Sequence, residues 1–373
     1  MSTTAPAKQG LEGMVAGDSA ICSVEQGKLI YRGYDISDLA ENATFEAVAH
    51  LLLVGHKPSE SELADFDARL KAARTLNADA LEVLKVAAAK PGIHPMDVLR
   101  TTVSFLAHVD PQAQDNSPEA ELNKSITLTG VIPTIIGHMQ NVIDGRDIVA
   151  PDMNLSHAAN LLYMMTGEKP TKTAEKIIDV SLILYAEHDF NASTFTSRVI
   201  AGTLSDMHGA VTGAIAALKG PLHGGANEAA MDMIKEVGTL ENVEPFMKDA
   251  FATKKKIMGF GHRVYKNGDH RASILHALGR QFAEEQGGEA VRWFEVGEKI
   301  QAVMDAEKGI FPNVDFPCGL TYFVMGIPVP QYTPIFVAAR ITGWAAHIME
   351  QHQNNRLIRP LSNYTGKLGL SWN

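Results

Sequence analysis

Helical segments with recognisable caps account for most of this chain of 373 residues. Examples are TFEAVAHLLLVG from Thr44, SESELADFDARLKAAR from Ser59, HPMDVLRTTVSFLAHV from His94 and LSHAANLLYMMTG from Leu155. Several of them begin with Ser, Thr or Pro and end at Gly, as helices commonly do. Almost the only evidence for strands is SAICSVEQGKLIYRG at residues 19–33, where two short β-branched runs flank a turn with a glycine. We therefore predict a mainly α-helical fold with a small N-terminal β-hairpin.

Chain length and the placement of glycines indicate two domains. A chain of this length, with 45% hydrophobic residues, exceeds the usual size of one compact domain. Two glycine clusters, at residues 220–228 and 259–271, together with FPNVDFPCG at 311–319, flank more charged helical sequence. We predict a small domain at residues 224–320 and a large, discontinuous helical domain at 1–223 and 321–373. The glycines would serve as hinges or as close contacts to a ligand, so we also expect closure on substrate.

Charge and cysteine content restrict the function and the compartment. The formal net charge of −10 leaves no basic surplus for nucleic-acid phosphates, so we expect a small-molecule substrate and no nucleic acid. Cys22 and Cys318 are far apart and fit no ligand or redox spacing, which favours a reducing compartment. The N-terminus lacks the pattern of a signal or transit peptide, and the apolar runs are too short to span a membrane. We therefore expect a cytoplasmic protein with no membrane partner.

Three of the fourteen histidines lie in contexts that point to a site. His223 precedes two glycines that open a helix, whose dipole would keep the imidazole neutral and able to donate a hydrogen bond. His262 follows Gly259 and Gly261, whose backbone amides would be open to a close ligand. His188 ends the helical segment EKIIDVSLILYAEHDF, at the end of an apolar stripe, so it should face inward. A turn histidine, an ordinary tight turn and a core histidine are the respective structural alternatives.

Arginines on apolar faces suggest an anionic ligand. The helix TPIFVAARITGWAAHIMEQ, with Thr333 as its expected N-cap, carries Arg340 on a face shared with aromatic residues. A guanidinium on such a face is costly without an anion, so it should meet a carboxylate of the protein or of a ligand. Arg271 and Arg359 could supply further contacts of this kind. Several arginines near histidines would make a site for a small polycarboxylate.

Motifs for metals and nucleotides are missing. The sequence has no H-E-x-x-H, C-x-x-C or H-x-H string, so we expect no catalytic metal. It also has neither the phosphate loop G-x-x-x-x-G-K-[ST] nor a strand-associated G-x-G-x-x-G for a dinucleotide.

Six motifs, in this order, resemble those of the citrate synthase family: AEHDFNASTFTSR, GPLHGGANE, IMGFGHRVYK, FPNVD, AARITGWAAHIMEQ and RPLSNYTG. The resemblance extends from about Leu11, through YRGYDISDLA, to Gly366. It implies a mainly α-helical, two-domain fold in a homodimer. It also implies an acyltransferase that condenses acetyl-CoA with oxaloacetate and water to give citrate and CoA, with no metal and no permanently bound cofactor.

The resemblance assigns catalytic roles to three residues. Asp315 would be the base that removes a methyl proton from acetyl-CoA, and Pro312 and Pro317 would restrict the backbone around it. His223 would donate a hydrogen bond to the thioester oxygen as the enol forms. His262 would hold and protonate the oxaloacetate carbonyl.

The resemblance also implies the substrate contacts. His188, Arg271 and Arg340 would bind oxaloacetate, and Arg359 would reach in from the partner subunit. The glycine loop would receive the adenine of CoA, with two lysines as phosphate partners. The expected CoA contacts are Lys256, Met258, Gly259, Phe260, Gly261, Lys266 and Asn313.

The chain departs from the family pattern at two places. The family usually reads Asp-Pro-Arg where this chain has Asp269, His270 and Arg271, so the turn before Arg271 lacks a φ angle fixed by proline. FPCG after Asp315 lies where family members vary. The short N-terminus has no room for the extra domain associated with NADH inhibition in longer bacterial members, so we expect no inhibition by that route.

Two other functions stay open. A 2-methylcitrate synthase would use propionyl-CoA and needs room for one more methylene, which is worth only about 1 to 3 kcal/mol in a pocket. The more remote alternative is a helical protein that binds CoA or a polycarboxylate without catalysis.

Overall fold

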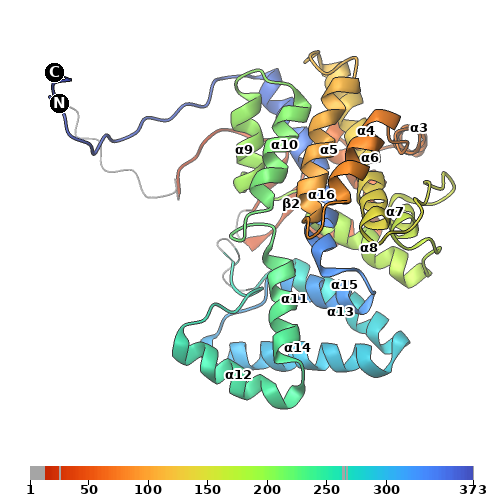
Figure 1. Cartoon of the computed structure of the whole chain (residues 1–373), viewed down its shortest axis with the longest axis vertical. Helices are drawn as coiled ribbons and strands as arrows, with labels where there is room; N and C mark the ends of the chain where they lie inside the picture. Colours follow the sequence, from red (N-terminus) through yellow and green to blue (C-terminus); the bar gives the residue numbers. More distant parts are fainter. Residues whose placement is uncertain (1–12, 25–26, 263–264, 266–267, 373) are drawn as a thin grey trace.

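The architecture is described from a computed structural model covering residues 13–24, 27–262, 265 and 268–372 (Figure 1). These residues form sixteen α-helices, one 3₁₀ helix and three strands of two residues each, which confirms the prediction of a mainly α-helical fold. The first ten helices are α1 Ile36–Asn42, α2 Phe45–Val54, α3 Glu60–Ala72, α4 Ala78–Ala88, α5 Pro95–Val109, α6 Pro118–Ile143, α7 His157–Thr166, α8 Lys172–Tyr185, α9 Ala192–Ala201 and α10 Met207–Leu218. The others are α11 Ala226–Val237, α12 Leu240–Thr253, α13 His270–Gln286, α14 Gly288–Lys308, α15 Asp315–Val324, the 3₁₀ helix η3 Val329–Gln331 and α16 Tyr332–Gln353.

The N-terminal strands form a small antiparallel sheet. Strands β1 (Cys22–Ser23), β2 (Ile30–Tyr31) and β3 (Tyr34–Asp35) pair in the order β1-β2-β3. The predicted hairpin corresponds to β1 and β2, and β3 extends it by a strand that the sequence did not reveal. The buried hydroxyl of Tyr31 donates a hydrogen bond to the Glu187 carbonyl at 2.9 Å, which ties the sheet to the segment after α8.

Local capping explains where the helices begin and end. The Thr44 side chain accepts the Ala47 N–H at the start of α2, and Gly55 ends that helix with a φ of +99°. Ser59 and Glu62 form a reciprocal capping box at the start of α3. These ends match the boundaries predicted from the sequence.

Helix α16 is the centre of the larger group of helices. Every residue from Tyr332 to Met349 is buried, and the helix packs against α2, α6, α8, α9 and α10. Its long neighbour α6 is apolar and long enough to cross a membrane, but 83% of its most apolar stretch is buried inside the fold. Helix α6 is therefore a core helix of this group.

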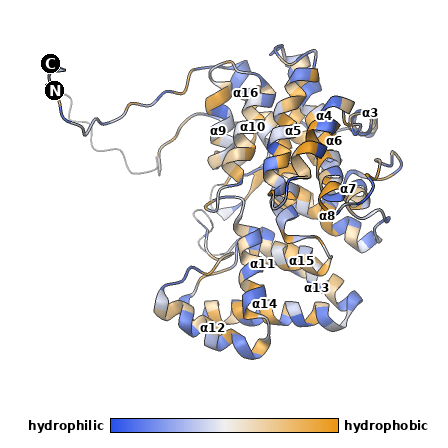
Figure 2. Ribbon diagram, viewed as in Figure 1, coloured by the Kyte–Doolittle hydropathy of each residue, from blue (hydrophilic) through white to orange (hydrophobic). Residues whose placement is uncertain are grey.

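Helices α11–α15 pack on one another at the other end of the molecule (Figure 1). Helix α13 contacts α8 and α11 contacts α16, which joins this group to the larger one. Hydrophilic and hydrophobic residues alternate along α12 and α14 (Figure 2), as expected of helices with one solvent-facing side. The predicted boundary at residue 320 falls inside α15, whereas the one at 223/224 falls in the turn before α11. The division into two domains stays a prediction.

Two predicted helix ends are wrong. Helix α16 begins at Tyr332 because η3 runs directly into it, so Thr333 lies inside the first turn and its hydroxyl binds the Glu228 carboxylate instead of capping. Helix α8 ends at Tyr185, three residues before His188. The Tyr185 carbonyl at that end accepts a hydrogen bond of 2.6 Å from Nε of Arg340. In a longer helix, this carbonyl would instead accept a backbone N–H from the next turn.

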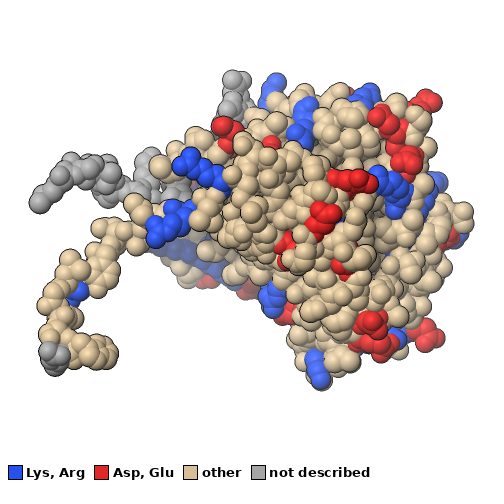
Figure 3. Space-filling model, turned by 90° about the horizontal axis from the view of Figure 1, so that it is seen from above, with Lys and Arg blue, Asp and Glu red and all other residues tan. Residues whose placement is uncertain are grey.

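The end of the chain leaves the helical body. Residues 354–372 carry no regular element and are mostly exposed, and Figure 1 shows them running away from the helices as an arm. Seen from above, the molecule carries basic and acidic side chains interspersed over its surface (Figure 3).

Candidate active site

A cleft of about 900 Å³ lies between the larger group of helices and α11–α15. Twelve of the fourteen predicted site residues line it, although they come from segments far apart in the sequence. They are His188, His223, Lys256, Met258, Gly259, Phe260, Gly261, His262, Arg271, Asn313, Asp315 and Arg340.

The two remaining predicted residues are not among those that line the cleft. Arg359 is exposed on the C-terminal arm, which runs away from the body of its own chain (Figure 1). Lys266 lies outside the described residues.

Asp315 is the first residue of α15. Its Oδ1 accepts a hydrogen bond of 2.8 Å from the Tyr185 hydroxyl, and its N–H donates to Oδ1 of Asn313. Burial raises the pKa of Asp315 to about 6, although Tyr185 and Arg271 act in the opposite direction. A carboxylate with this pKa is a stronger base than an exposed aspartate and is still largely ionised at neutral pH.

The segment before Asp315 is joined to the glycine loop by three hydrogen bonds. The Asn313 N–H donates to the Gly259 carbonyl at 2.9 Å, and its side-chain amide donates to the Gly261 carbonyl at 3.0 Å. The Gly261 N–H donates in turn to the Phe311 carbonyl. The loop predicted to receive CoA and the segment that carries Asp315 therefore form one unit.

Glycine is required at position 259 for two reasons. Its φ is +81°, a conformation that other residues adopt only at a cost. A Cβ added there would also lie 2.8 Å from Cβ of Phe316. The loop thus approaches α15 more closely than a side chain would allow.

His223 is neutral, and its tautomer follows from one contact. Its Nε2 lies 3.2 Å from the Ser193 N–H, which can only donate, so Nε2 accepts and Nδ1 carries the proton. Burial lowers the pKa of His223 to about 4, and the positive charge of Arg340 lowers it further. The predicted neutral state agrees with this shift, whose main cause is burial rather than a helix dipole, and the Ser193 N–H that His223 accepts lies in the first turn of α9.

His188 and His262 lie side by side in the cleft. Their ring centroids are 5.2 Å apart, and Tyr265 contacts both rings. Nδ1 of His262 accepts the Tyr265 N–H at 3.2 Å, so the neutral ring carries its proton on Nε2. Burial, followed by the charges of Arg271 and Arg340, holds the pKa of His188 well below its ordinary value.

Arg271 is fixed by a bidentate ion pair with Asp269. Nε and one terminal nitrogen of the guanidinium donate to the two carboxylate oxygens at 3.0 and 2.9 Å. Burial opposes the charge, but the Asp269 carboxylate more than compensates and raises the pKa of Arg271. Asp269 also caps α13 by accepting the Arg271 N–H, and it accepts the Val314 N–H beside Asp315. Asp269 therefore orients the Arg271 side chain.

Arg340 presents the second buried guanidinium. It is 1% exposed, lies over the Phe336 ring at 4.7 Å and donates from Nε to the Tyr185 carbonyl. The described part of the chain offers its two terminal nitrogens no hydrogen-bond partner. Because Arg340 lines the cleft, those nitrogens can meet a carboxylate that enters it.

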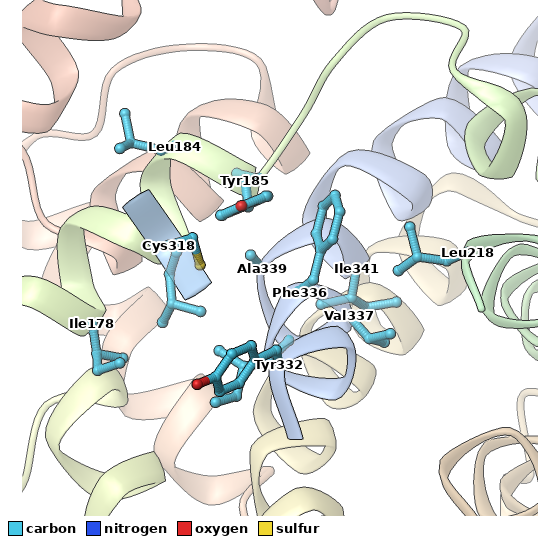
Figure 4. Close-up of a cluster of buried hydrophobic side chains, with 14 of the residues drawn as sticks. Ile178, Leu184, Tyr185, Leu218, Cys318, Tyr332, Phe336, Val337, Ala339 and Ile341 are labelled. Atoms are coloured by element: carbon cyan, nitrogen blue, oxygen red, sulfur yellow. The ribbon is translucent and has the colours of Figure 1, made fainter. Parts of the chain in front are cut away.

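The hydrophobic core reaches the floor of this cleft. Figure 4 shows Tyr185 from α8, Cys318 from α15 and Phe336 from α16 next to one another. The rings of Tyr185 and Phe336 have centroids 4.3 Å apart, and both residues line the cleft. These two rings therefore bound the space beside Asp315.

Sequence reasoning missed three residues that position the site: Tyr185, Asp269 and Ser193. Asp269 two residues before Arg271 fits the pattern of a helix N-cap, which could have identified its role. Tyr185 and Ser193 lie inside the motifs around His188, but nothing in their spacing links them to Asp315 and His223, 130 and 30 residues away.

Comparison with known proteins gives the family. The family model described as "Citrate synthase, C-terminal domain" matches residues 10–361. The chain is 42% identical to citrate synthase 2 of Bacillus subtilis (strain 168), over 96% of each chain, and 43% identical to 2-methylcitrate synthase 2 of Corynebacterium glutamicum, over 98% of this chain and 96% of that one. The citrate synthase of Thermoplasma acidophilum, solved as a ternary complex with carboxymethyl coenzyme A and oxaloacetate, matches with a TM-score of 0.92 at 30% identity, over 98% of this chain and 97% of that one. This chain belongs to the citrate synthase family.

Proposed function

We propose that the protein is a citrate synthase that condenses acetyl-CoA with oxaloacetate and water to give citrate and CoA through an enol. The observation that carries the proposal is the half-buried Asp315 carboxylate, whose pKa is raised to about 6, in one cleft with His223, His262 and two buried arginines. A base, a neutral hydrogen-bond donor and cationic anchors for a dicarboxylate are the groups that this condensation needs.

Asp315 begins the reaction by taking a proton from the methyl carbon of acetyl-CoA. The electron pair of the broken C–H bond forms a C=C bond, and the negative charge that develops on the thioester oxygen gives an enolate, which a hydrogen bond from His223 stabilises with enol character. Nδ1–H of His223 donates a hydrogen bond to that oxygen. The neutral His223 is suited to this role because Ser193 already occupies its Nε2.

The enol carbon then attacks the ketone carbon of oxaloacetate. His262 holds the ketone oxygen through Nε2–H and gives it the proton as the new C–C bond forms. Water hydrolyses the resulting thioester and releases CoA. No step requires a metal or a permanently bound cofactor.

The carboxylates of oxaloacetate meet His188, Arg271 and Arg340. We further propose that the protein is a cytoplasmic homodimer and that Arg359 enters the cleft of the partner subunit. The extended arm that carries Arg359 away from its own cleft supports this arrangement.

CoA lies along the loop Met258–Gly261 with Asn313. Lys256, exposed on the lining of the cleft, and Lys266 would pair with its phosphates. Because the loop is hydrogen-bonded to the segment before Asp315, CoA bound at the loop would lie next to the segment that carries the base.

A 2-methylcitrate synthase is the second candidate, because relatives of similar identity carry each name. The carbon that reacts must touch Asp315, so the extra methyl of propionyl-CoA would lie against Tyr185 or Phe336, which border Asp315. One such group changes binding by only about 1 to 3 kcal/mol, so both activities are compatible with this site.

The test is release of free thiol from acetyl-CoA and from propionyl-CoA, each with oxaloacetate, after exhaustive chelation, with the products identified by mass spectrometry. A kcat/KM higher for acetyl-CoA, with citrate as product, supports the proposal. A preference for propionyl-CoA would assign the protein as a 2-methylcitrate synthase. No thiol release from either would leave only a binding protein.

A further inference from the structure

A second group of polar side chains converges at the turn between α2 and α3. One ring nitrogen of His50, one of His56 and a carboxylate oxygen of Glu62 lie within 4.8 Å of one another. His50 lies on α2, His56 directly follows the Gly55 cap, and Glu62 lies in the first turn of α3. None of the three lines the active-site cleft, and the proposed reaction uses none of them.

His50 is held with one nitrogen ready to bind a cation. Its Nδ1 lies 3.2 Å from the His56 carbonyl oxygen, which can only accept, so Nδ1 carries the proton and Nε2 keeps its lone pair. This backbone contact is the kind that orients histidine ligands in metal sites. The imidazole also packs edge-on against Phe66, which restricts its rotation.

Glu62 is oriented by the helix cap. Its Oε2 accepts hydrogen bonds from the backbone N–H and the hydroxyl of Ser59 at 2.8 and 2.7 Å, so Oε1 is turned toward Nε2 of His56 at 3.1 Å. The side chains of both His56 and Glu62 remain accessible to solvent.

We propose that His50, His56 and Glu62 bind one Zn²⁺ ion per chain, with water completing the coordination. Two imidazole nitrogens and one carboxylate oxygen form a ligand set that Zn²⁺ accepts, with bonds of about 2.0 to 2.2 Å. Tetrahedral ligands at that distance lie about 3.4 Å apart, so the site closes only if the exposed His56 and Glu62 side chains rotate toward His50. The ring proton of His56 would move to Nδ1 when Nε2 binds the ion. The ion would link α2 to α3 independently of the catalytic cleft.

Zinc titration of the full chain without a histidine tag tests this proposal. Chelator-stripped protein is titrated with ZnCl₂ by calorimetry, zinc retained after dialysis is measured by elemental analysis, and the Tm is recorded with and without zinc. The variants are His56→Ala and Glu62→Gln. Glutamine at this position still completes a capping box, so the second variant changes the ligand and keeps the helix start. His108→Ala, which removes an exposed histidine at another place, is the matched control.

The expected result is one Zn²⁺ per wild-type chain and a higher Tm with zinc. His56→Ala and Glu62→Gln should each weaken binding by about tenfold or more, and His108→Ala should bind as the wild type does. Absence of saturable binding to the wild type would overturn the proposal. Binding that His56→Ala leaves unchanged would also overturn it, because the ion would then lie at another site.

Discussion

The Tyr185 hydroxyl donates a hydrogen bond of 2.8 Å to Oδ1 of Asp315, and this bond joins helix α8 to the first residue of α15. Burial and this hydrogen bond have opposite effects on the pKa of Asp315. Burial raises the pKa of Asp315, and the hydrogen bond from Tyr185 lowers it. The basicity of Asp315 is therefore a balance that a single substitution can change.

Tyr185→Phe should raise the pKa of Asp315 above its present value of about 6. A hydrogen bond to a charged group contributes about 1.5 to 3 kcal/mol, which corresponds to an upward shift of about one unit or more. Since the base acts only when ionised, the acid limb of the pH profile of kcat/KM should move to higher pH. The control is Tyr322→Phe, because the Tyr322 hydroxyl bonds to Ser181 and not to Asp315. An acid limb that stays in place in Tyr185→Phe would rule out this role.

Asp269→Asn should lower both stability and affinity for oxaloacetate. Removing one partner of a buried ion pair leaves the other charge uncompensated, which costs about 3 to 5 kcal/mol of stability, and Arg271 would lose the contact that orients it.

The ion pair also makes stability depend on pH. Burial acts to raise the pKa of Asp269, but Arg271 holds it below its ordinary value of 3.8. The ionised pair therefore stabilises the fold above that pH, and its contribution disappears as the pH falls through the lower folded pKa. Thermal unfolding at pH 7 and pH 3, with KM for oxaloacetate, measures these effects; equal Tm and KM in both proteins at pH 7 would contradict the account.

Gly259→Ala should raise KM for the acyl-CoA substrate by about tenfold, which corresponds to about 1.4 kcal/mol. Its Cβ would collide with Phe316 and displace the loop relative to the segment that carries Asp315. Gly145→Ala is the matched control, because Gly145 also has a positive φ of +67° but no atom within 4 Å of an added Cβ. A similar KM in both variants would show that close packing at position 259 is not needed.

His223 should stay neutral throughout the working pH range. Its pKa of about 4 lies below the ordinary 6.5, so its ring signal in NMR, assigned with His223→Gln, should not move between pH 5.5 and 8. The unfolded chain binds this proton near pH 6.5 and the folded one near pH 4, so this group destabilises the fold as the pH falls through that window. A titration midpoint above pH 6 would exclude the neutral donor assigned to His223.

Most helices and most residues of the cleft could be predicted from the sequence, whereas the long-range contacts that position those residues could not. Caps such as Thr44 and Ser59 depend on neighbouring residues, so they could be recognised locally. The end of α8 could not, because the Tyr185 carbonyl is taken by Arg340, 155 residues later. The resemblance located Arg271 and noted that the turn before it lacks a proline. It did not reveal the bidentate contact with Asp269, which only the folded chain shows.

The measurement that tests the central claim most directly is thiol release by Asp315→Asn compared with the wild type, with acetyl-CoA and oxaloacetate. Asparagine has nearly the same shape and can still accept the hydrogen bond from Tyr185, but it cannot take the proton. General bases contribute about 10²- to 10⁴-fold, so kcat should fall by at least about a hundredfold while calorimetry shows that oxaloacetate still binds. A variant that binds oxaloacetate and keeps a kcat within a few-fold of the wild type would show that Asp315 is not the base.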